Sequence, residues 1–423
     1  MIFAEAFVKR HARLLLVAAI VALPNAGAAS EGLTSIANAP VANVSVATAS
    51  TTTDARSEPR TVRLQSKLLG ESRTLHVSVP ANYRIAKQRY PVVYLLDGHV
   101  RAFFDLTVAA TNYDLLGDMH DFAIPAQIVV GIEQVDRGTD LARNGELFTR
   151  FIVEELIPYI DREYRTVPFR TLIGHSLGGR LALQTFCRAP DMFPAVVAIS
   201  ASLPDSVMTE VQGCMRRLFA ARGERVRQLV LSAGDRETRL IGSTLRLQTF
   251  VRDSAPAWWR LQLVEGKGLG HTETPLATIP PAIRFIFDRT VWEMPSASAD
   301  SMLSHLGDPV ERVNAHVRAL RARVGYRATP SAKWMEVTAQ TLLSRVDLEG
   351  AAAAATRLIE VYPERITGYT ILADVQVLRR DTAAARRSIL DALQLLDRLE
   401  VFDEGQRDAQ RASLRKSLSS ISG

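Results

Sequence analysis

The chain has 423 residues, enough for two or three domains, and its 47% hydrophobic and 23% charged residues are ordinary for a globular protein. The formal charge is +6, but the lysines and arginines are spread along the sequence and form no run suited to nucleic acid. We therefore expect no nucleic-acid partner.

The first 28 residues have the pattern of a secretory signal peptide. It comprises a positive region with Lys9, Arg10 and Arg13, an apolar core from Leu14 to Leu23, and a small-x-small cleavage site at Ala26-Gly27-Ala28. The apolar core is short for a membrane span, although an uncleaved anchor is the alternative, and no second run of spanning length follows. We expect an exported protein, periplasmic or secreted, without a stable membrane span. Residues 29–57 are rich in Ala, Ser and Thr and are predicted to be a flexible linker.

Residues 58–294 alternate between strand-like and helix-like patterns. Two strands with period-two alternation flank Gly70, and buried strands are predicted at 90–98, 125–132, 171–173, 194–200, 228–233 and 259–264. Helices are predicted at 103–116, 147–164, from 180 to about 188, and 243–253. This alternation predicts an α/β domain with a doubly wound, mostly parallel sheet and helices on both faces.

After a linker at 295–307, residues 308–423 are predicted to form a small all-α domain. Helices are expected at 310–323, 332–344, 348–361, 366–378 and 382–398. The helix-capping residues Asp347 and Asp381 lie 34 residues apart, which is the tetratricopeptide period. We expect about two degenerate repeats that could bind a protein partner; an unrelated small helical bundle is the alternative.

The segment Gly174-His175-Ser176-Leu177-Gly178 lies between a buried strand and a helix. A serine in this G-x-S-x-G turn has its hydroxyl exposed on a strained backbone, beside unpaired N–H groups of a helix N-terminus. Ser176 is the candidate nucleophile.

A nucleophilic serine needs a base and an orienting acid, which follow it in the order acid, then histidine, in the α/β-hydrolase topology. Of the three histidines after Ser176, only His271 lies in a Gly-rich loop after the last predicted strand. The acid should follow strand 228–233, where Glu237 is preferred and Asp235 is the alternative.

The oxyanion hole needs two converging N–H donors. Leu177 is the first candidate, and the second is His99, with Gly98 as the alternative, after strand 90–98. Arg137 follows strand 125–132 at the same sheet edge and could bind an oxygen-rich group of the substrate, although a solvated surface arginine is the alternative.

These residues, with the segments YPVVYLLDG, VVGIEQVDR, FIVEELIPYIDREYR and IGHSLGG, resemble the putative-esterase branch of the α/β hydrolases from about residue 60 to 292. That branch includes siderophore, feruloyl and acetyl-xylan esterases, and a tetratricopeptide-like tail is similar to that of one subset. The resemblance implies hydrolysis of a small-molecule carboxylic ester with Ser176 and His271, and a substrate-side Arg137.

No cofactor or metal is expected, because the sequence has no H-E-x-x-H or C-x-x-C motif and few histidines. Cys187 and Cys214 could pair in an oxidising compartment, but the sequence does not decide whether they meet. Two alternatives to an esterase are acyl transfer on the same triad and a non-catalytic protein acting through its helical repeats.

Overall fold

The structure is a computed structural model that describes residues 59–112, 125–221, 225–288, 292, 307–326, 328–399 and 402–421. Outside these residues lie the predicted signal peptide, the predicted linker at 29–57, the predicted linker at 295–307 apart from residue 307, and the end of the helix predicted at 103–116.

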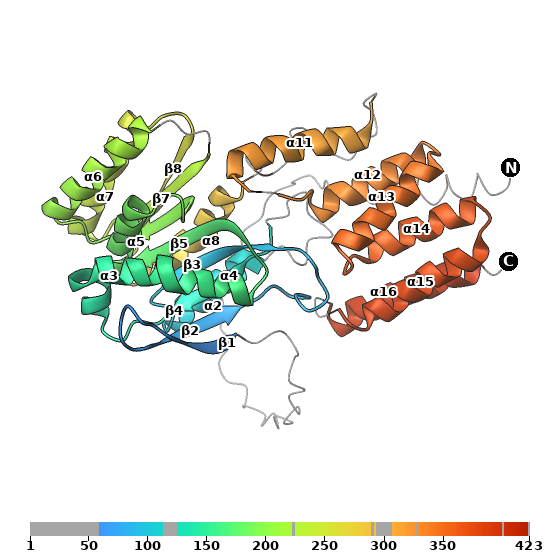
Figure 1. Cartoon of the computed structure of the whole chain (residues 1–423), viewed down its shortest axis with the longest axis horizontal. Coiled ribbons are helices and arrows are strands. Elements are labelled where there is room, and N and C mark those ends of the chain that lie inside the picture. The colour runs from blue at the N-terminus through green and yellow to red at the C-terminus, as the bar shows by residue number, and fades with distance from the viewer. Residues whose placement is uncertain are drawn as a thin grey trace, which may run out of the picture. The chain divides into compact units, whose positions relative to one another are not determined.

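Eight strands form one mixed sheet in the order β1-β2-β4-β3-β5-β6-β7-β8 (Figure 1). They are β1 (Arg60–Gln65), β2 (Ser72–Ser78), β3 (Tyr90–Leu96), β4 (Ile128–Ile132), β5 (Thr166–His175), β6 (Ala195–Ile199), β7 (Arg227–Gly234) and β8 (Trp259–Gly266). Strands β1, β2 and β4 pair antiparallel, and all pairs from β4 to β8 are parallel. The predicted doubly wound, mostly parallel sheet is confirmed, and its parallel strands end at one shared edge.

Helices cover both faces of this sheet, and strand side chains alternate between two apolar clusters. One face packs against α3 (Gly145–Arg150), α4 (Ile157–Glu163), α5 (Leu177–Arg188), α6 (Asp205–Ala220) and α7 (Thr238–Ser254). The other face packs against α2 (Arg101–Asn112) and α8 (Thr274–Ile286). In β3, for example, Val92 and Tyr94 face the first cluster whereas Val93 and Leu95 face the second. Burial on both faces explains why β3 reads as an uninterrupted apolar run.

The helix predicted at 147–164 differs from expectation because it is interrupted. A π-helical segment, η4 (Phe151–Leu156), lies between α3 and α4, and another, η3 (Thr139–Arg143), precedes α3. Pro158 occupies the first turn of α4, where it cannot donate an N–H bond to the preceding turn.

The C-terminal region is all helical, as predicted, and its elements repeat. It contains α11 (Pro309–Val324), α12 (Ala332–Ser344), α13 (Leu348–Val361), α14 (Ile366–Leu378), α15 (Thr382–Leu396) and α16 (Glu404–Ser420). Asp347 and Asp381 both cap helices, each accepting a backbone N–H bond of 2.9 Å. The preceding residues, Val346 and Arg380, share a left-handed backbone with φ near 60°. Two helical hairpins with the same turn thus recur at the predicted spacing, and their assignment as tetratricopeptide-like repeats remains a prediction.

Candidate active site

Ser176 lies at the turn between β5 and α5 in a strained conformation. Its φ is 59° and its ψ is −115°, although it is not a glycine. Its N–H donates to the carbonyl of Ile199 at 2.9 Å, which ties the turn to the neighbouring strand. A Cβ on Gly174 would lie 2.2 Å from the carbonyl oxygen of Gly178, so only glycine permits this close crossing of strand and helix. The strain and the glycine requirement are those expected of an exposed nucleophile on a strand-to-helix turn.

His271 follows β8 and faces a carboxylate from the end of β7. Its Nδ1 lies 2.6 Å from Oε2 of Glu237, whose side chain is only 4% exposed. Asp235, the alternative acid, is exposed and instead accepts the backbone N–H of Gly268 at 2.9 Å. The structure therefore brings Glu237 to the imidazole and places Asp235 under the backbone of the same loop.

Several donors hold the Glu237 carboxylate in place. Its Oε1 accepts hydrogen bonds from Ser200 Oγ at 2.7 Å, Gly234 N at 2.8 Å and Thr274 Oγ1 at 2.8 Å. Burial raises the pKa of Glu237, but the hydrogen bonds from Ser200, Gly234, His271 and Thr274 outweigh it and lower the pKa below its usual value. Glu237 is thus an ionised acceptor with one oxygen left for His271.

His271 lies beside the serine turn because its loop is bound to the residue before Ser176. The Nε2 of His175 is 2.8 Å from the carbonyl oxygen of His271, and the two imidazole rings are 4.4 Å apart between centroids. Glu237 thus binds the His271 ring, and the backbone of His271 lies beside the turn that carries Ser176, at the carboxyl edge of the sheet.

Two backbone N–H groups are the candidate oxyanion donors. Leu177 is the first residue of α5, where a helix leaves its N–H groups without acceptors inside the helix. On the opposite loop, the N–H of Gly98 already donates to the carbonyl of Ile132 at 2.9 Å. The next N–H, that of His99, is therefore the stronger second candidate.

Arg137 reaches the same edge, but its guanidinium is held by the protein. Its Nε and Nη2 donate to the two carboxylate oxygens of Asp97 at 2.6 and 2.9 Å, and Nη2 also donates to the carbonyl of His175 at 3.0 Å. The side chain of Asp97 is 3% exposed and that of Arg137 is 36% exposed. Arg137 therefore joins the loop after β3 to the serine turn, a contact that the sequence did not reveal.

A small cavity of about 170 Å³ lies beside the candidate oxyanion loop. It is lined by Pro59, Thr61, His76, Gly98, His99, Arg101 and Phe104. Within the described ranges, no group of His, Cys, Asp or Glu side chains is arranged to hold a metal ion. None of the helices in those same ranges is long and apolar enough to cross a membrane.

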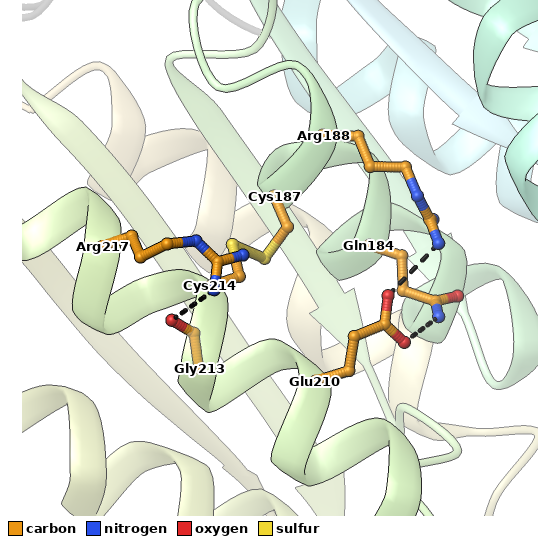
Figure 2. The surroundings of a disulfide bond; sticks show 7 residues. All are labelled: Gln184, Cys187, Arg188, Glu210, Gly213, Cys214 and Arg217. Carbon is orange, nitrogen blue, oxygen red and sulfur yellow. Dashed lines mark hydrogen bonds and ion pairs between the residues drawn. A yellow bond between two sulfur atoms is a disulfide. The ribbon is translucent and has the colours of Figure 1, made fainter.

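Cys187 and Cys214 form a disulfide that links α5, the helix after Ser176, to α6 (Figure 2). Beside it, Glu210 of α6 accepts hydrogen bonds from Gln184 at 2.8 Å and from Arg188 at 3.2 Å, both on α5. The pairing that the sequence left undecided is therefore present, and it links the helix that follows the candidate nucleophile to α6.

Four residues that support the site were not among those predicted from the sequence. Ser200 and Thr274 bind the Glu237 carboxylate, His175 binds the His271 backbone, and Asp97 binds Arg137. In the sequence, His175 occupies a variable position of the G-x-S-x-G motif, which gives no indication of its role. Ser200 ends a predicted strand and has a left-handed φ of 44°, which a sequence does not disclose for a non-glycine residue.

Comparison with known proteins identifies the family. The model of the putative esterase family matches residues 66–277, half of the chain. The chain belongs to the putative esterase family. The chain is also similar to the crystal structure of an IroE-like serine hydrolase from Shewanella oneidensis, with a TM-score of 0.57, 22% identity, and coverage of 72% of this chain and 99% of the other. That likeness confirms the predicted α/β-hydrolase fold.

Two curated relatives of this esterase-family protein come from Bacillus subtilis (strain 168). The uncharacterized protein YjcH is 33% identical over 156 residues, covering 35% of this chain and 63% of the relative. Ferri-bacillibactin esterase BesA is 31% identical over 170 residues, covering 34% of this chain and 58% of the relative. The chain thus spans less than two thirds of the length of either relative.

Proposed function

We propose that this member of the putative esterase family is an exported serine esterase that hydrolyses a small-molecule carboxylic ester. Ser176 is the nucleophile, His271 the general base and Glu237 the acid that orients it. The observation that carries the proposal is the 2.6 Å contact between His271 Nδ1 and Glu237 Oε2, in a loop bound to the strained serine turn. A carboxylate on Nδ1 fixes the proton there and leaves Nε2 free to accept the serine proton.

The reaction follows from these roles. Ser176 Oγ attacks the ester carbonyl carbon while its proton passes to Nε2 of His271, and the negative charge develops on the carbonyl oxygen. The N–H groups of Leu177 and His99 stabilise that oxyanion, each worth roughly 3 kcal/mol of barrier in comparable sites. Collapse breaks the ester C–O bond, the imidazolium protonates the departing alcohol, and an acyl-enzyme on Ser176 remains. Water, deprotonated by His271, then cleaves it to the carboxylic acid.

We propose a model substrate for assays and a class of natural substrate. Short acyl esters need only the serine turn, the oxyanion donors and room for a small acyl group, so we expect p-nitrophenyl acetate to be cleaved. Because one relative is a ferri-bacillibactin esterase, a siderophore ester is the first natural class to assay. Fold similarity does not decide the substrate, so activity on siderophore, feruloyl and short acyl esters should be compared directly.

Export and the helical region complete the proposal. The disulfide between Cys187 and Cys214 is of the kind that persists in oxidising compartments, which supports the predicted signal peptide at residues 1–28. Edman sequencing of the exported protein should then begin at Ala29. We assign catalysis to residues 58–294 and propose that helices within 308–423 form a tetratricopeptide-like domain for a protein partner.

The test compares hydrolysis of p-nitrophenyl acetate by the wild type and by Ser176→Ala. The proposal expects turnover by the wild type and none above background for the variant, with both proteins unfolding at similar temperatures. Added alcohol distinguishes acyl transfer, since a transferase would give ester rather than acid as the main product. A folded wild type that neither hydrolyses nor transfers the acyl group would favour a non-catalytic, partner-binding protein.

A further inference from the structure

His175 is a half-buried histidine next to the candidate nucleophile, and the proposed chemistry does not use it. It ends β5, its ring contacts that of His271 at 4.4 Å, and the ring of Phe103 packs edge-on against it at 5.6 Å. The His175 side chain thus lies between α2 and the loop after β8, and it contacts both of these segments, which are far apart in the sequence.

The hydrogen bond from His175 determines its tautomer. Its Nε2 lies 2.8 Å from the carbonyl oxygen of His271. A carbonyl oxygen can only accept, so Nε2 must carry the proton and donate it. Burial, and next the neighbouring His271, lower the pKa of His175 to about 4, whereas the hydrogen bond and Asp97 raise it and Arg137 lowers it. The ring is therefore neutral at physiological pH, with its proton on Nε2.

We propose that His175 is a positioning residue that holds the backbone of His271 against the serine turn. This inference rests on the proposed esterase function. His271 is then fixed at two independent points: Glu237 binds Nδ1 of its ring, and His175 binds its main-chain oxygen. The loop contains glycines at 266, 268 and 270, which leave its backbone permissive. Bonds from Asp235 and Arg236 hold the residues before His271, and His175 adds the contact at the backbone of His271 itself.

The neutral state of His175 matters because His271 becomes positively charged during the reaction. A second positive imidazole 4.4 Å from the first would oppose that charge. A donor that stays uncharged supplies the hydrogen bond without this repulsion. The position therefore requires an N–H donor of the right length and no charge, which a glutamine side chain can imitate and a methionine side chain cannot.

The experiment measures kcat and KM for p-nitrophenyl acetate in the full mature chain, with active sites counted by phosphonate titration. We expect His175→Met to lower kcat per titrated site about tenfold, the effect of one lost hydrogen bond, and His175→Gln to recover most of the loss. KM should stay within about twofold, because the substrate itself is not contacted. If His175→Met folds poorly, His175→Asn takes its place. Its amide is too short to reach the carbonyl of His271, so the same loss of kcat per titrated site is expected.

The matched control is His316→Met. His316 makes the same type of bond, from Nε2 to the main-chain oxygen of Trp292 at 3.1 Å, in the helical region. It should leave kcat per titrated site unchanged. The inference is overturned if His175→Met keeps wild-type kcat, or if His175→Gln is as impaired as His175→Met. Absence of Ser176-dependent hydrolysis in the wild type would instead overturn the proposed function, and the inference with it.

Discussion

Replacing Glu237 with glutamine should invert the hydrogen bond to His271 while changing the side-chain shape very little. Oε1 of Glu237 accepts the backbone N–H of Gly234 at 2.8 Å, and this donor cannot rotate away. The amide oxygen of Glu237→Gln must therefore occupy this position, which leaves the NH₂ group facing Nδ1 of His271. That group donates where the carboxylate accepted, so the His271 proton moves to Nε2 and points at Ser176.

The wrong tautomer of His271 cannot take the serine proton. The corresponding acid-to-amide change in a serine protease lowers kcat about 10⁴-fold, equivalent to about 5.4 kcal/mol of barrier, and we expect a loss of this size. The assay is p-nitrophenyl acetate hydrolysis at pH 7.5, with folding checked by thermal denaturation. The unfolding temperature should fall only modestly, because the three donors to Oε1 keep an acceptor but lose its negative charge.

Asp235→Asn provides the matched control for this prediction. Asp235 lies two residues away, is exposed, and uses Oδ1 to accept the N–H of Gly268. Its amide analogue retains an oxygen acceptor, so kcat should stay within about threefold of the wild type, as for a surface substitution. If Glu237→Gln stays within tenfold of wild type while Asp235→Asn loses the activity, the assignment of the acid is wrong.

Three further substitutions test the surroundings of the site, each by urea denaturation. Ser200→Ala removes a hydrogen bond to the Glu237 carboxylate and should cost about 2 kcal/mol at pH 7. Because the pKa of Glu237 is lowered in the folded state, the stabilisation is complete above about pH 4.5 and is lost as the pH falls through the folded-state pKa. The difference in unfolding free energy between Ser200→Ala and the wild type should therefore shrink at pH 3. An unchanged difference would contradict an ionised Glu237 as the acceptor. Arg137→Met leaves the buried carboxylate of Asp97 unpaired and should lower the unfolding free energy by about 2 kcal/mol, less than for a fully buried pair because Arg137 is partly exposed. A rise in KM without loss of stability would instead support the substrate-binding role expected from the sequence. Replacing Cys187 and Cys214 by serine should cost about 3.5 kcal/mol for a separation of 27 residues, and no loss would show that the disulfide constrains little.

The sequence predicted the parts of the site that depend on local pattern. The serine turn can be predicted from the sequence because a strand that passes this close to the following helix requires glycine at 174, two residues before Ser176. The parallel strands can be predicted because burial on both faces requires an uninterrupted run of apolar residues. The serine turn follows from steric contacts between residues close in sequence, and the buried strands follow from a run of apolar residues, so both can be recognised in the sequence.

The sequence could not separate Glu237 from Asp235, because both follow the same strand and both serve the His271 loop. Which carboxylate meets the imidazole depends on the path of that loop, including the bond from Arg236 N to the carbonyl of Leu269. The donors to Glu237 come from β6 and from the start of α8, so their meeting depends on sheet order rather than on spacing.

Besides the short π-helical segment η3, helices α6 and α8 in the described part of the proposed catalytic region had no counterpart among the predicted elements. Helix α8 contains Pro280 and Pro281 in its interior, residues that normally end a helix, and its apolar face packs into the core despite them. Helix α6 carries Gly213 in its interior, which weakens the helical signal, and the disulfide at Cys214 ties it to α5. Tertiary packing overrides local propensity in both cases.

The account depends most on Ser176 being a nucleophile activated by His271. Incubation with a p-nitrophenyl phosphonate, followed by peptide mass spectrometry, tests this directly. We predict one adduct per chain, on the peptide containing Ser176, which is absent in Ser176→Ala and forms far more slowly in His271→Ala. A folded wild type that forms no adduct, or forms it on another residue, would contradict the proposed mechanism.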